Sequence, residues 1–184
     1  VTLNNYNEPT ADRRFADQVR TLMEHDLPVA VLSNASTFTP DKVDALVAMG
    51  PIAYLSVNIS TLDRERYAQE RQRDHLPKVL EHLEYMKDKT IAKNMDLVVL
   101  GHEDEQHRAD TTALVERFGG SRFIVRSFEI MDRAGYLPIG LKPEKPFEKL
   151  AGCNNTGSRP IEHIHINPRG QCVLCCEDYD EFHK

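Results

Sequence analysis

The feature that most constrains this chain's fold is a regular alternation of short apolar segments with longer segments of helical periodicity. Strands that alternate with helices in this way build a parallel sheet with right-handed crossovers. After an opening run that ends before Glu8, the apolar segments lie at residues 28–33, 52–58, 95–101 and 123–128. The sequence therefore predicts an α/β fold with about five βα repeats.

The ends of the predicted strands carry neither a dinucleotide-binding fingerprint nor a phosphate-binding P-loop. A sheet of the barrel type is therefore favoured over a nucleotide-binding doubly wound sheet. Five repeats are too few to close an eight-stranded (β/α) barrel. We expect a partial (β/α) barrel over residues 1–130, either open or completed by residues upstream of Val1, which is not an initiator methionine.

Polar side chains stand at the ends of the first three predicted strands. Pro9 biases Glu8 toward an extended or turn conformation, which places its carboxylate at the end of the first strand. Asn34 follows the second strand, and Asn58 and Ser60 end the third. Parallel α/β folds place ligand-binding groups at this edge. The alternatives are a solvated loop around Glu8 and simple capping of the strand ends by the other residues.

Two further features concern the segments between the strands. Asp12 stands just ahead of the apolar-periodic run that starts at Phe15, so it is predicted to cap that helix. Six of the ten residues from 64 to 73 are charged. We expect them to form a solvated helix or loop over the mouth of the barrel.

The charge and the apolar content exclude several classes of partner. The chain has a net charge of -6 and no block of Lys and Arg, which argues against nucleic acid or an anionic membrane as a partner. No apolar run has the length of a membrane span, and the first residues do not form a signal peptide. We therefore expect a cytoplasmic, globular protein.

The pattern changes after residue 130. Glycines and prolines interrupt residues 131–146 and predict a linker. Residues 161–166 then alternate with period two, residues 167–170 predict a turn, and residues 171–176 predict the returning strand. The chain's four cysteines all lie in this C-terminal part, at Cys153, Cys172, Cys175 and Cys176.

Without a secretory signal, such a cysteine cluster predicts metal binding before it predicts disulfides. The four thiols could complete one iron–sulfur cluster, or two of them could bind zinc with His163 or His165. Cys175 and Cys176 are adjacent and would point to opposite faces of a strand, so both are not expected at one ion. Alternatively, Cys172 or Cys176 is a small buried core residue.

Several segments, in order along the chain, resemble radical S-adenosylmethionine (SAM) enzymes with a SPASM or twitch-type C-terminal extension. Residues 6–9 resemble the family's glycine-glycine-glutamate-proline strand end, and residues 32–35 resemble its threonine-asparagine-glycine. Residues 57–63 resemble its serine-leucine-aspartate strand. Later matches are residues 67–71 with 79–80, residues 133–135, and the spacing of Cys153, Gly170 and Cys175.

The resemblance implies that the opening strand is the second strand of a partial six-stranded barrel. It implies that Glu8 and its neighbouring backbone bind the amino group of the methionine part of SAM. Arg71 would pair with the carboxylate through its guanidinium fork, unless it is a solvated helix charge. Asn58 or Ser60 would approach the ribose, and Asn34 would line the same cavity.

The sequence also departs from the family's pattern. It has no cysteine triad with spacing three then two, and Tyr6 and Asn7 replace two glycines. We therefore expect a fragment, inactive alone, of a longer radical SAM oxidoreductase or modifying enzyme. The parent would use SAM and a [4Fe-4S] cluster to form a 5'-deoxyadenosyl radical, which abstracts hydrogen from a peptide or small-molecule substrate. Its reductant would be a ferredoxin or flavodoxin, and the C-terminal cysteines could hold an auxiliary cluster.

A different class of function stays open from the sequence. The same βα scaffold with a zinc-binding or other metal-binding knuckle could be a non-catalytic module that docks a peptide, because fold alone does not decide function.

Overall fold

The computed structural model describes residues 1–3, 8–102, 104–130, 163–167 and 169–173. The chain divides into two compact units, Val1–Phe128 and Glu129–Lys184. Each unit is described by itself below. The domain boundary expected after residue 130 stays a prediction.

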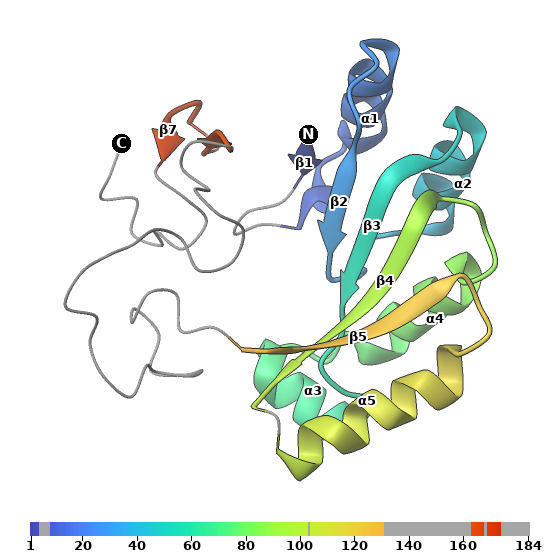
Figure 1. The fold of residues 1–184 in the computed structure, drawn as a ribbon, viewed down its shortest axis with the longest axis vertical. Coiled ribbons are helices and arrows are strands. Elements are labelled where there is room, and N and C mark those ends of the chain that lie inside the picture. The colour runs from blue at the N-terminus through green and yellow to red at the C-terminus, as the bar shows by residue number, and fades with distance from the viewer. Residues whose placement is uncertain (4–7, 103, 131–162, 168, 174–184) are drawn as a thin grey trace. The chain divides into compact units, whose positions relative to one another are not determined.

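The first unit is built on one sheet of five strands in the order β1-β2-β3-β4-β5 (Figure 1). The strands are β1 (Thr2–Leu3), β2 (Ala30–Ser33), β3 (Ile52–Asn58), β4 (Ala92–Gly101) and β5 (Phe123–Glu129). The pairings from β1 to β4 are parallel. Each strand lies beside the next one in the sequence, as in a barrel wall, whereas a doubly wound sheet reverses its order. The predicted partial-barrel α/β fold is confirmed.

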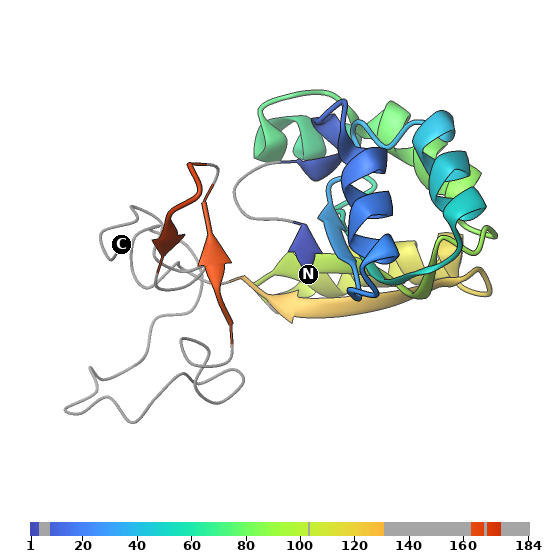
Figure 2. The same ribbon diagram turned by 90° about the horizontal axis from the view of Figure 1, so that it is seen from above.

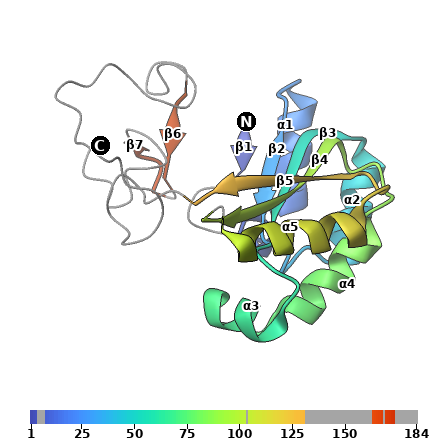
Figure 3. The same ribbon diagram turned by 60° about the horizontal axis from the view of Figure 1, so that its bottom comes forward.

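The helices lie on one face of this sheet (Figures 2 and 3). They are the 3-10 turn η1 (Pro9–Ala11) and the helices α1 (Phe15–Glu24), α2 (Pro40–Met49), α3 (Arg64–Arg71), α4 (Leu76–Met86) and α5 (Glu105–Phe118). Right-handed crossovers that all progress in one direction place their helices on the same side. The opposite face carries no helix among the described residues, and we call it the helix-free face.

The predicted cap of the first helix is wrong. Arg14 occupies the N-cap position of α1 and makes no side-chain capping bond, whereas Asp12 ends η1. The reason is that Pro9 starts a separate 3-10 turn, in which the N–H of Asp12 bonds to the Pro9 carbonyl at 3.2 Å. The helix therefore begins only at Phe15.

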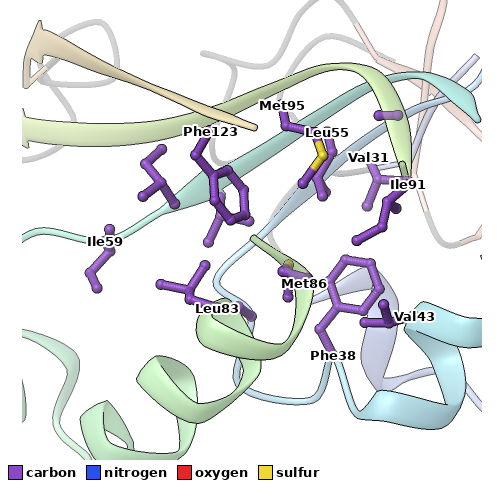
Figure 4. Packing of buried hydrophobic residues seen from close by; sticks show 14 of the residues in the cluster. Val31, Phe38, Val43, Leu55, Ile59, Leu83, Met86, Ile91, Met95 and Phe123 are labelled. Atoms are coloured by element: carbon purple, nitrogen blue, oxygen red, sulfur yellow. The ribbon is translucent and has the colours of Figure 1, made fainter. Parts of the chain in front are cut away.

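The hydrophobic core fills the space between the helices and the sheet (Figure 4). Phe15 and Phe38 meet edge to face in it, with ring centroids 5.9 Å apart. Leu55 and Val57 on β3 are fully buried in this core. Because side chains alternate along a strand, Tyr54, Ser56 and Asn58 belong to the helix-free face.

The described part of the second unit is a short antiparallel hairpin of β6 (His165–Ile166) and β7 (Cys172–Val173). The Gly170 N–H donates to the Asn167 carbonyl at 2.9 Å, and Gly170 has a φ of +78°, which favours glycine. The predicted hairpin and its turn are confirmed, with strands of two residues each. Among the described residues of both units, no helix has the length and apolarity needed to cross a membrane.

Candidate functional site

The Glu8 carboxylate connects the turn η1 to the end of β2 through hydrogen bonds. Its Oε1 accepts hydrogen bonds from the Thr10 N–H at 3.1 Å, the Thr10 hydroxyl at 2.5 Å and the Ser33 hydroxyl at 2.7 Å. Among the described residues, the one donor to its Oε2 is the Asn34 N–H, at 2.6 Å. A carboxylate oxygen accepts about two hydrogen bonds, and Oε1 already accepts three. Oε2 therefore keeps the capacity to accept one further donor.

A second layer of bonds holds this junction in place. The hydroxyls of Thr10 and Thr37 are 2.8 Å apart. The Lys42 ammonium donates to the carbonyls of Thr10 at 2.6 Å and Thr37 at 3.0 Å. Thr10 is fully buried. Residues 8–10 are thus fixed against the loop after β2, and the Glu8 carboxylate is held in one position.

The turn after β2 has an unusual backbone. Ala35 is fully buried and has a φ of +59°, a conformation that L-residues with a side chain rarely adopt. The Ala35 carbonyl accepts a 2.6 Å hydrogen bond from Nδ1 of the buried His82. The Asn34 side-chain oxygen accepts the Ser36 N–H at 2.9 Å. Asn34 therefore sits on a turn fixed from both sides.

Arg71 returns from the far end of α3 to the end of β3. Its Nη2 donates to the Asn58 side-chain oxygen, 13 residues away in the sequence. The Arg71 guanidinium also lies 6.0 Å from the ring centroid of Tyr67, whose burial raises the pKa of its phenol above its usual value. The segment predicted as a solvated helix or loop is thus a helix, and it is anchored by a buried tyrosine.

The start of α3 is fixed by a second set of contacts. Asp63 caps the helix by accepting the Arg66 N–H at 2.9 Å. The Arg66 guanidinium pairs with Asp110 of α5 and donates to the hydroxyl of the buried Thr61. These bonds connect α3 to both its neighbouring helix and the loop after β3, so they set where Arg71 can reach.

The Ser60 hydroxyl is buried and has no hydrogen-bond partner among the residues the structure describes. Buried polar groups in proteins are nearly always hydrogen-bonded, and leaving one unpaired costs about 1–3 kcal/mol. Ser60 is therefore a position where a ligand could satisfy a protein group.

These side chains lie along one edge of the sheet. Ser33 and Val57 are partners in the parallel register of β2 and β3, which brings Asn34 beside Asn58 at a strand spacing of about 4.8 Å. Glu8 is bonded to Asn34, and Arg71 to Asn58. The edge thus offers a carboxylate, a guanidinium and two amides. This set of charges complements an amino acid with a free ammonium and a free carboxylate.

The chain matches the family model of the Radical SAM superfamily over residues 6–115, more than half of its 184 residues. The chain belongs to the radical SAM superfamily. The family predicted from the sequence is confirmed by this match.

Two solved structures are similar to this radical SAM chain. Both are of Streptococcus suis SuiB, one bound to the precursor peptide SuiA and the other bound to S-adenosylmethionine. Their sequence identities are 15% and 16%, they cover 71% and 74% of this chain, and the TM-scores are 0.48 and 0.46. The chain spans only 29% and 31% of those two chains. None of the curated proteins matches the chain.

The metal ligands predicted for this radical SAM chain can be compared with the structure only at Cys172. It is exposed, so the alternative of a buried core residue is wrong for it. Cys172 pairs with Ile166 across the hairpin, whereas His165 pairs with Val173. Cys172 therefore lies on the opposite face from His165, which does not favour a zinc site that combines the two.

The other three predicted ligands, Cys153, Cys175 and Cys176, lie outside the described residues. Within the described ranges, no three His, Cys, Asp or Glu side chains are grouped so that they could hold a metal ion. The metal site of the radical SAM chain therefore stays a prediction.

A polar cluster on the helix-free face was not predicted from the sequence. Asp96 on β4 accepts hydrogen bonds from the Tyr54 hydroxyl at 2.7 Å and from Arg126 Nε at 2.6 Å. Burial and the bond to Asp96 raise the pKa of Tyr54 above its usual value, so the phenol stays a donor. The signal was present in the sequence, because Asp96 interrupts an otherwise apolar run between Met95 and Leu97.

Proposed function

We propose that this chain binds S-adenosylmethionine at the carboxyl edge of β1, β2 and β3, as part of a radical SAM enzyme that modifies a peptide. The observation that carries the proposal is a pair of bonded residues on neighbouring strands: Glu8 accepts the Asn34 N–H, and Arg71 donates to Asn58, which lies beside Asn34 in the register of β2 and β3. This set lies within the residues that match the superfamily model.

In this proposal each side chain meets a part of the cofactor that suits its chemistry. Oε2 of Glu8 accepts the methionine ammonium, since it is the oxygen with spare acceptor capacity. Arg71 pairs with the methionine carboxylate, because a guanidinium forms charge-assisted, bidentate bonds to carboxylates. The buried Ser60 hydroxyl, which has no partner in the described part of the chain, and the Asn58 amide bind ribose hydroxyls, and Asn34 lines the same site.

When it is bound and reductively cleaved beside a [4Fe-4S] cluster, SAM supplies a 5'-deoxyadenosyl radical that abstracts hydrogen from a substrate. The residues of this chain orient the cofactor for that chemistry. The chain has no cysteine triad with spacing three then two. We therefore propose that residues outside these 184 hold the catalytic cluster and that a ferredoxin or flavodoxin reduces it.

The peptide substrate is proposed from the character of the helix-free face. Among the described residues, four large apolar side chains are exposed on this face. They are Leu32 on β2, Leu100 on β4, and Ile124 and Phe128 on β5. Exposed apolar side chains next to the charged pair of Asp96 and Arg126 suit a ligand with both apolar and polar groups, as a peptide has.

The C-terminal cysteines are proposed to hold an auxiliary cluster, with Cys172 accessible for it. Metal analysis of the purified chain separates this proposal from a zinc-binding docking module. Iron, sulfide and broad visible absorption support the cluster, whereas stoichiometric colourless zinc contradicts it.

The activity is tested on the longer protein that includes a cysteine triad, supplied anaerobically with iron, sulfide, dithionite and SAM. We expect 5'-deoxyadenosine to form, and Arg71→Ala to lower its rate at least tenfold. Arg64→Ala is the matched control in the same helix, because Arg64 pairs with the exposed Asp74. The proposal is wrong if no deoxyadenosine forms or if both variants behave alike.

A further inference from the structure

A second place on the first unit combines a buried charge with an accessible one. Asp96 is only 2% exposed, although it lies on the face of β4 that no described helix covers. Its neighbours Met95 and Leu97 point into the core, which fixes the Asp96 side chain on the helix-free face. A buried carboxylate is costly unless charges and hydrogen bonds compensate it.

Within the described part of the chain, hydrogen bonds reach one of the two Asp96 carboxylate oxygens. Its Oδ2 accepts from the Tyr54 hydroxyl and from Arg126 Nε. Its Oδ1 is buried and has no hydrogen-bond partner within the described part of the chain. An unpaired buried carboxylate oxygen is rare in proteins, which marks this position as more than a structural ion pair.

The Arg126 guanidinium is fixed through Nε, which leaves its terminal nitrogens available to a ligand. The bond to Asp96 uses Nε, and the side chain is 50% exposed. The terminal nitrogens Nη1 and Nη2 have no acceptor among the described residues. They form the outer edge of a planar fork that can bind both oxygens of a carboxylate. Because Asp96 fixes Nε, less side-chain entropy is lost when such a ligand binds.

We propose that Arg126, positioned by Asp96 and Tyr54, binds a carboxylate group of the substrate on the helix-free face. The substrate role rests on the proposed function, whereas the binding of a carboxylate can be measured without it. A peptide offers such a group either on an acidic side chain or at its C-terminus.

The position of this site suits a substrate anchor. Asp96 is the register partner of Ser56, which lies two residues before Asn58 on β3. Two residues along a strand span about 7 Å. A ligand held by Arg126 would therefore lie in the same region of the sheet edge as the proposed SAM site. It would be about two residues nearer the amino ends of the strands and displaced toward β5. The buried Asp96 Oδ1, which has no partner among the described residues, would then accept an N–H of the same peptide.

The test measures the binding of short peptides to the full chain through the side-chain ¹⁵N signals of its arginines. The probes are acetyl-Ala-Glu-Ala-amide for a side-chain carboxylate, acetyl-Ala-Ala-Ala with a free C-terminus, and acetyl-Ala-Gln-Ala-amide as the neutral peptide. We expect at least one carboxylate peptide to shift the Arg126 Nε signal saturably, with at least tenfold tighter binding than the neutral peptide. The arm that binds identifies the source of the carboxylate.

The key variant is Arg126→Lys, which keeps a positive charge beside Asp96 and so protects the fold, but removes the fork. We expect it to weaken carboxylate binding at least tenfold. Arg117→Lys is the matched control, because Arg117 also pairs with a carboxylate through Nε, that of Glu84, on the helical side of the unit. We expect this control to bind the probes as the wild type does.

Three results would overturn the inference: no preference for a carboxylate over the neutral peptide, unchanged binding by Arg126→Lys, or equal weakening by Arg117→Lys. SAM binding is measured on the same samples. If the wild type binds carboxylate peptides but not SAM, the proposed function is contradicted. If it binds SAM but no carboxylate peptide, the proposed role of Arg126 is contradicted.

Discussion

At the scale of a single residue, the Glu8 carboxylate has a structural role and a proposed cofactor-binding role. It accepts four hydrogen bonds from Thr10, Ser33 and Asn34, and it is proposed to bind the cofactor's ammonium. Glu8→Gln replaces one acceptor oxygen by an NH₂ donor, which cannot accept the Asn34 N–H. We expect the free energy of unfolding to fall by about 1–3 kcal/mol, measured by urea denaturation. Glu24→Gln at the exposed end of α1 is the control. An unchanged midpoint for Glu8→Gln would contradict this account of the junction.

The left-handed backbone of Ala35 makes a second prediction at the residue scale. Relief of the positive φ is worth about 1–2 kcal/mol, and this offsets the roughly 0.8 kcal/mol lost with a buried methyl group. Ala35→Gly should therefore leave the free energy of unfolding within about 0.5–1 kcal/mol of the wild type. The same position resembles the glycine of the family's threonine-asparagine-glycine, and the positive φ gives the physical reason for that glycine.

Ala92→Gly is the matched control for Ala35→Gly, since Ala92 is also fully buried but lies in the extended backbone of β4. It loses the same methyl group without relieving strain, so we expect a cost of about 1–2 kcal/mol. Equal costs at both positions in thermal or urea unfolding would show that the Ala35 backbone is not strained.

The titration of Asp12 is predicted from its contact with Arg14. The Arg14 side chain and N–H donate to the Asp12 carboxylate and lower its pKa from 3.8 to about 2. Because the folded pKa lies below the unfolded one, this contribution to stability is present above about pH 4. It is lost as the pH falls toward 2. Carboxyl ¹³C shifts should show Asp12 titrating near 2 and moving toward 3.8 in Arg14→Gln. A similar shift in the neighbouring Arg13→Gln would indicate a general charge effect instead.

At the scale of the element, the position of α3 determines whether Arg71 can reach Asn58 on β3. Arg66 fixes the helix through Asp110, and the two side chains are 24% and 13% exposed. Arg66→Gln leaves the Asp110 carboxylate without its partner, and we expect a loss of about 1–3 kcal/mol. Arg64→Gln is the control in the same helix. Its pair with Asp74 is 67% and 41% exposed and screened by solvent, so we expect no measurable loss. Equal losses in urea unfolding would contradict the anchoring role of Arg66.

The elements that were predicted from the sequence are those in which the spacing of apolar residues, within the element itself, indicates a strand or a helix. β3 and α4 have apolar residues at strand and helix spacing, and Gly50 ends α2 with a φ of +95°. The predicted start of α1 was wrong, because Asp12 ends the 3-10 turn that begins at Pro9 and so does not cap α1. The Arg126 and Asp96 pair was missed since its members are 30 residues apart and meet only through the sheet. Strand-end residues could be predicted as a group, but their mutual bonds depend on register, which the sequence does not state.

At the scale of the whole molecule, sequential strand order is what makes one edge and one face available for function. Helices on one side bury the core. The carboxyl edge then carries Glu8, Asn34, Asn58 and Arg71, and the helix-free face carries Arg126. Cofactor and substrate sites are thus proposed on neighbouring parts of one sheet in the first unit.

The central claim, that this edge binds SAM, is tested most directly by titrating the ¹⁵N-labelled chain with SAM. The signals to follow are the side-chain amides of Asn34 and Asn58, and the amide of Asn94 is the control. Asn94 lies on β4 opposite Tyr54, toward the amino end of the strand. We predict saturable shifts of the Asn34 and Asn58 amides, abolished by Arg71→Ala, with the Asn94 amide unmoved. Shifts confined to Asn94 or to residues away from this edge, or no saturable shift at all, would contradict the claim.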